Sequence, residues 1–126
     1  MADAKEKVIA LLSSTASVDM KTAANTSLYT VPTGKSCVVT SVVVRGPTAS
    51  LAGGTDYDLG FTSATYADWV DGQSLATMTT ATTDAFPLFA PQKVTIGVAA
   101  EIFKLKVNTG STLAATTTID VFGYIF

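Results

Sequence analysis

The feature that most constrains the fold is a pair of strand-like segments joined by a tight turn, at residues 28–44. The segment reads Leu-Tyr-Thr-Val-Pro-Thr-Gly-Lys-Ser-Cys-Val-Val-Thr-Ser-Val-Val-Val. β-branched and aromatic residues fill both runs, and the Pro-Thr-Gly sequence between them favours a turn. The pattern predicts two antiparallel strands that pair with each other across this turn.

Strand signals continue along the rest of the chain. Glycine, proline, aspartate and asparagine punctuate it at the spacing of roughly 8–12 residues that is typical of sandwiches and jelly rolls. We therefore predict an all-β fold, an antiparallel β-sandwich or jelly roll of about eight strands. Strands are expected near residues 27–32, 36–45, 55–61, 66–70, 73–79, 84–89, 92–98, 101–108 and 116–126.

Two of these strands differ in the faces that they bury. Residues 102–107 alternate apolar side chains with two lysines, so this strand has one face in water. Residues 116–126 are apolar on both faces, which indicates burial on both sides. Two explanations stay open: a central strand between two layers, or an aromatic ladder of Phe122, Tyr124 and Phe126 that another subunit covers.

The first 26 residues differ from the strand pattern. Charged residues at 5–7 precede an apolar run at 8–12, and Asp3 can cap a helix that starts there. Residues 13–27 are rich in Ser, Thr, Ala and Asn, which is typical of an extended linker. These features predict an N-terminal arm with a short helix.

We expect residues 1–26 to form this arm and residues 27–126 to form the body of the protein. A helix of two or three turns is marginal in water by itself. The arm is therefore expected to dock on its own barrel, to dock on a neighbouring molecule, or to stay mobile until assembly.

The composition excludes most catalytic chemistry. The 126 residues include no histidine and one cysteine. Without histidine, a serine or cysteine nucleophile needs a lysine base, and no Ser-x-x-Lys spacing occurs. Cys37 lies in an apolar strand, where we expect a buried thiol. We predict that the protein is not an enzyme.

The motifs that resemble ligand sites are incomplete. Residues 34–36 read Gly-Lys-Ser, like the end of a phosphate-binding loop, but position 29 is tyrosine and a valine-rich strand follows. Asp56 and Asp58 share a strand face, and Asp68, Asp71 and Asp84 lie nearby, without the spacing of a calcium loop. We expect these carboxylates to be solvated. The alternatives are that they perform acid–base chemistry or bind calcium. No cofactor or metal is predicted.

Charge and hydropathy limit the kinds of partner and the cellular location that are expected. The net charge of −2 gives no basic field, so nucleic acid binding is not expected. The N-terminal apolar run is too short and its flank too acidic for a secretory signal. No stretch approaches the ~20 apolar residues that a membrane helix needs. We expect a protein that is made in a cytoplasm and does not enter membranes.

Four elements occur in order along the chain: the opening at 28–35, the Gly-Gly-Thr-Asp-Tyr-Asp-Leu-Gly-Phe segment at 53–61, Trp69, and the Val-Phe-Gly-Tyr sequence at 121–124. With these elements, the chain from Leu28 onward resembles small virion proteins encoded in tailed-bacteriophage genomes. The resemblance implies a non-enzymatic head decoration or cement protein with a jelly-roll body. It also implies a place on the capsid surface at junctions of the major capsid protein, and a homo-oligomer, with a trimer favoured.

Under this hypothesis the arm and the last strand carry the contacts. The expected capsid contacts are Val8, Ile9, Leu11 and Leu12. The aromatic residues expected at an oligomer interface are those of the last strand, Phe122, Tyr124 and Phe126.

Other virion functions also fit the sequence. One alternative is a receptor- or glycan-binding module of a head or tail fibre, in which Tyr57, Tyr66 and Trp69 form an aromatic platform. We expect Trp69 to be buried, which weakens this alternative. Another is a tail-tube, connector or spike component.

Overall fold

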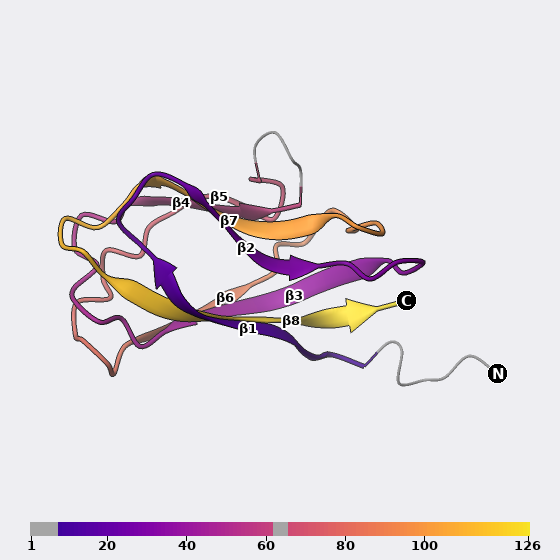
Figure 1. Cartoon of the computed structure of the whole chain (residues 1–126), viewed down its shortest axis with the longest axis horizontal. Coiled ribbons are helices and arrows are strands. Elements are labelled where there is room, and N and C mark those ends of the chain that lie inside the picture. Colours follow the sequence, from indigo (N-terminus) through magenta and orange to yellow (C-terminus); the bar gives the residue numbers. More distant parts are fainter. Residues whose placement is uncertain (1–7, 62–65) are drawn as a thin grey trace.

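In the part of the chain that the structure describes, eight strands form two four-stranded antiparallel sheets that stack face to face (Figure 1). A computed structural model describes residues 8–61 and 66–126. The strands are β1 (Ala10–Asp19), β2 (Asn25–Thr30), β3 (Cys37–Arg45), β4 (Asp56–Gly60), β5 (Val70–Gln73), β6 (Ala85–Phe89), β7 (Ile102–Thr109) and β8 (Thr116–Ile125).

The order of the strands is that of a jelly roll. One sheet has the order β1-β8-β3-β6 and the other has the order β2-β7-β4-β5. Successive strands lie in opposite sheets, except β4 and β5, which pair with each other in one sheet. This crossing pattern of eight strands is the jelly-roll arrangement. The predicted all-β sandwich is therefore confirmed.

The predicted pairing of the two strands around residues 28–44 is wrong. β2 pairs with β7, whereas β3 pairs with β8 and β6. The turn itself does form, because the Lys35 amide donates to the Pro32 carbonyl at 3.1 Å and Gly34 has a φ of 75°. A positive φ at the third position is the geometry of a type II turn. The turn carries the chain from one sheet to the other.

The helix predicted near the N-terminus is wrong for the residues that the structure describes. Residues 10–12 begin β1, and the expected linker at 13–27 contains the rest of β1 and the start of β2. β1 pairs along β8, from Ala10 opposite Gly123 to Asp19 opposite Thr116. This pairing satisfies backbone groups that a short isolated helix leaves exposed to competition from water. Asp3 lies outside the described residues.

Of the three arrangements expected for the arm, docking on its own barrel is therefore the one seen for residues 10–19. This docking reaches the core. Val18 and Met20 are buried between the sheets, at 1% and 0% exposure.

The sequence predicts too many strands between residues 66 and 98. Where two strands were expected at 66–70 and 73–79, only the four-residue β5 forms. Residues 92–98 contribute one isolated bridge, between Gly97 and Cys37. Threonine-rich sequence suits a strand only where a partner strand and a half-buried face are present, so strand propensity alone misleads here.

The core lies between the two sheets and centres on Phe103, which is fully buried. Its ring meets Phe61 and Trp69 edge to face, with centroids 5.1 Å and 6.0 Å away. The Trp69 indole donates to the Val39 carbonyl in the opposite sheet at 2.9 Å. Cys37 also lies in this core at 0% exposure, as predicted.

The buried thiol gives a direct test of the fold. Burial raises the pKa of Cys37 to about 11. The thiolate is the reacting form, so about 0.1% of the thiol is reactive at pH 8 even before steric exclusion is counted. We expect native protein to resist an aromatic disulfide reagent at pH 8 and denatured protein to react with one equivalent. Rapid labelling of the native protein would contradict the buried position.

Candidate functional site

A row of side chains crosses the outer surface of the β1-β8-β3-β6 sheet. Leu11 lies opposite Phe122, Phe122 lies opposite Ser41, and Ser41 lies opposite Phe89. Directly opposed residues of an antiparallel pair share a face. Val121, the neighbour of Phe122 in β8, is fully buried, so Phe122 points away from the core. The row therefore lies on the outside of the sandwich.

A second row lies beside it, nearer the ends of the chain. Tyr124 lies opposite Val38, and the ring centroids of Tyr124 and Phe126 are 6.0 Å apart. Ile9 precedes Leu11 by two residues and so shares its face. The two rows make a surface that we call the outer apolar face, which consists of Ile9, Leu11, Phe89, Phe122, Tyr124 and Phe126.

Much of this surface is open to water. Phe89 is 76% exposed, and Ile9 and Leu11 are 60% and 54% exposed. Single exposed apolar residues are ordinary on a protein surface, whereas a contiguous group of large ones marks an interaction site. The outer apolar face is therefore the candidate functional site.

The structure brings together two residue sets that the sequence treated separately. Leu11, from the predicted capsid contacts, lies opposite Phe122, from the predicted oligomer aromatics. Val8 is also exposed, at 56%. Leu12 differs, because a register shift between Leu11 and Ser13 places it against the core. The roles assigned to these residues stay predictions.

Phe89 is the member of the face that sequence reasoning missed. In β6, Leu88 is buried while Pro87 and Phe89 are exposed. Strict alternation along residues 85–89 places an aromatic side chain on the wet side of this strand. That signal was available in the sequence, although Pro87 inside the strand and Pro91 after it obscure the strand pattern.

A neutral polar group borders the apolar face. The Arg45 Nε donates to Asp120 at 2.8 Å, and the Ser14 hydroxyl donates to the other carboxylate oxygen at 2.6 Å. The hydrogen bond from Arg45 is the main cause that lowers the pKa of Asp120. The charges of Arg45 and Asp120 cancel, so this pair adds no net charge beside the outer apolar face.

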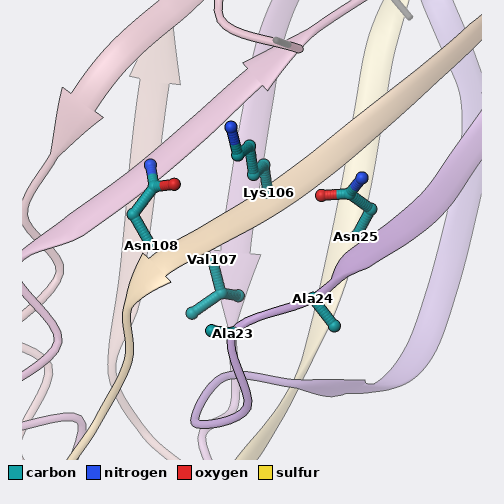
Figure 2. A pocket seen from close by; sticks show the side chains of 6 residues that line it. All are labelled: Ala23, Ala24, Asn25, Lys106, Val107 and Asn108. Carbon is teal, nitrogen blue, oxygen red and sulfur yellow. The ribbon is translucent and has the colours of Figure 1, made fainter. Parts of the chain in front are cut away.

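The outer surface of the opposite sheet is polar. Lys104 and Lys106 alternate with buried residues of β7, as predicted. Lys106 and Asn108 point into an open hollow beside Asn25 (Figure 2). The other lining residues are Ala23, Ala24 and Val107. This lining holds one cation and no acid–base pair.

Metal and membrane sites are not seen in the described part of the chain. Among residues 8–61 and 66–126, no three His, Cys, Asp or Glu side chains gather in a way that could hold a metal ion. Over the same residues, no helix is long and apolar enough to cross a bilayer.

Asp58 corrects the expectation that the carboxylates are solvated. It is 4% exposed and accepts hydrogen bonds from the Gly72 amide at 2.8 Å and the Asn108 side chain at 2.6 Å. Asn108 also donates to Asp56, at 3.2 Å. These bonds tie β4, β5 and β7 together. Asp56 and Asp58 therefore have a structural role.

The neighbouring Asp71 predicts a pH dependence. Its pKa is raised, first by the charge of Asp58 and then by a hydrogen bond to it. A raised folded-state pKa means that this group favours the fold below its unfolded pKa and loses that contribution as pH rises through the folded value. We expect Asp71→Asn to raise the melting temperature at pH 7. The gain should vanish near pH 3, and a lower melting temperature at pH 7 would contradict the repulsion.

The aromatic platform proposed for glycans is not available. Tyr57 and Trp69 are 1% and 3% exposed, and the Tyr57 hydroxyl donates to the Met20 carbonyl at 2.7 Å. Tyr66 is 9% exposed, and the Lys104 ammonium lies 4.8 Å from its ring centroid. Rings held in this way cannot stack on a sugar. Their burial counts against the glycan-binding alternative and confirms the expected burial of Trp69.

Comparison with known proteins places the fold. No family model and no curated protein sequence matches the chain. A chain in the structure titled "Cyanophage Pam1 capsid asymmetric unit" is similar with a TM-score of 0.55 and 11% identity, over 94% of this chain and 85% of that chain. A chain in "Acidic stable capsid structure of Helicobacter pylori bacteriophage KHP30" gives 0.52 and 16% identity, over 95% and 96%. The chain thus shares its fold, over nearly its whole length, with chains in two phage capsid structures.

Proposed function

We propose that this protein is a non-enzymatic structural component of a phage capsid, a decoration or cement protein that binds at junctions of major capsid subunits. The observation that carries the proposal is the outer apolar face. Burial of its side chains against another protein removes them from water. The fold shared with chains of two phage capsid structures supports a shell protein as that partner.

The energetics of the face fit stable attachment. Full burial of one large apolar side chain contributes about 1.5–3 kcal/mol, and several such side chains together offset the entropy lost on association. Only 14% of the residues are charged, so little charged surface has to lose its water on docking. The polar opposite sheet would then face the solvent outside the shell.

Many copies on a lattice strengthen such attachment. The homo-oligomer expected from the sequence, a trimer in the favoured case, would attach through several faces at once and so raise the overall affinity. The trimer stays a prediction.

The test uses purified protein and expanded, undecorated shells of its own phage. We expect stoichiometric binding, measured by co-sedimentation, and a higher temperature of shell disruption. Failure to bind these shells would refute the proposed function.

A further inference from the structure

β1 is the outermost strand of its sheet, and no described strand lies along its second edge. It has ten residues and carries no charge before Asp19. Register shifts after Leu11 and after Thr15 interrupt this edge, so its regular part lies at the start of the strand. Of the other outer strands, β6 contains Pro87, and β2 and β5 have six and four residues. Long uncharged edges without proline are templates for pairing with another chain.

The hydrogen-bond pattern shows which groups face this edge. Phe126 exchanges two main-chain hydrogen bonds, of 2.8 and 2.9 Å, with Ser36, the residue before β3. Alternation along β8 then directs the main-chain groups of Gly123 toward β1, where Gly123 lies opposite Ala10. Ala10 is therefore bound to β8. The main-chain groups of Leu11 therefore point away from β8, toward the free edge, and continued alternation gives Ile9, the residue before β1, the same orientation.

Ile9 and Leu11 thus belong to two surfaces at once. Their side chains lie on the outer apolar face, and their amide and carbonyl groups lie on the free edge. A partner that covers this corner removes water from those groups, and a buried unpaired amide or carbonyl weakens the complex. An extended chain satisfies successive main-chain groups at strand spacing. A register shift after Leu11 interrupts β1, so the regular part of its free edge ends at Leu11.

We propose that an extended, uncharged segment of the shell protein pairs with residues 9–11, at the start of β1, and adds a fifth strand to this sheet. This inference rests on the proposed function. A charged residue in the added strand would lie beside apolar side chains without a partner, which is costly.

A second copy of the chain fits this edge less well. Two-fold pairing of Ile9 with Leu11 of the copy would form four main-chain hydrogen bonds but would leave the outer apolar faces coplanar and still exposed. So few hydrogen bonds do not offset the freedom lost on association.

The first test compares two substitutions at the same position. Ile9→Pro removes the edge amide, and proline is tolerated where the amide faces solvent. Ile9→Ala removes the side chain but keeps the amide. We expect Ile9→Pro to bind shells about tenfold more weakly than Ile9→Ala, in line with the loss of a buried hydrogen bond. Equal or tighter binding by Ile9→Pro would overturn the inference.

Hydrogen exchange on the wild-type protein tests the same contact without a substitution. The Leu11 amide should exchange freely in the free protein and at least about tenfold more slowly on the shell. If the protein binds shells while this amide stays fast, strand pairing is overturned and the proposed function stands. If the protein does not bind, both fail. Slowing that depends on protein concentration without shells would indicate self-pairing and overturn the shell strand.

Discussion

Leu11→Ser combined with Phe122→Ser should weaken binding to undecorated shells by about tenfold or more while the protein stays folded. The two residues face each other at the β1–β8 pairing in the middle of the outer apolar face. Full burial of each side chain contributes about 1.5–3 kcal/mol, but Leu11 is already about half buried and Phe122 mostly buried in the free protein, so the expected loss is about 1–2.5 kcal/mol. Titration of labelled protein against shells measures the loss.

The matched control is on the opposite sheet. Lys104→Ser with Lys106→Ser changes two outward side chains of another central strand, and this variant should bind as the wild type does. If the control loses binding and the apolar variant keeps it, the contact belongs to the β7 side. Cys37 should stay unreactive in both variants, which verifies that the fold is intact.

The fold class was predictable because strand propensity and turn residues are local signals. The partner of each strand was not. Residues 32–35 form the predicted turn, but the same turn chemistry serves a hairpin and a crossing between sheets. What decides between them is where β7 and β8 lie, and these strands are far away in the sequence.

β1 escaped prediction for a physical reason. Register shifts after Leu11 and after Thr15, and a positive φ of 56° at Ser17, interrupt the period-two alternation that marks a strand. With that period broken, the apolar run at 8–12 matched a helix better than a strand. Pairing with β8 overrides the local preference.

The candidate site was predictable in its parts but not as a whole. The two-sided apolarity of β8 singled out Phe122, Tyr124 and Phe126, and the apolar run singled out Ile9 and Leu11. Their union depends on the pairing of the first strand with the last, a contact between segments more than 100 residues apart. The burial of Asp58 likewise depends on partners from two other strands.

Removal of residues 1–26 should abolish cooperative folding, whereas removal of residues 1–7 should leave the sandwich intact. The longer deletion takes away β1 and the buried side chains of Val18 and Met20. It also removes the Met20 carbonyl, which accepts hydrogen bonds from the Tyr57 hydroxyl and the Ser111 amide. Two buried apolar side chains and two orphaned donors together cost about 5–12 kcal/mol, comparable to the whole stability of a domain of this size.

Circular dichroism on heating and the reactivity of Cys37 measure the outcome. The longer deletion should give no sharp thermal transition and a thiol that reacts at once, because the core around it is open. The shorter deletion removes no residue of β1–β8 and should melt like the full chain. A sharp transition and a protected thiol in the longer deletion would instead support the division at residue 26. In that case β1 would be a detachable arm, free to leave its own sheet when the protein docks on the shell.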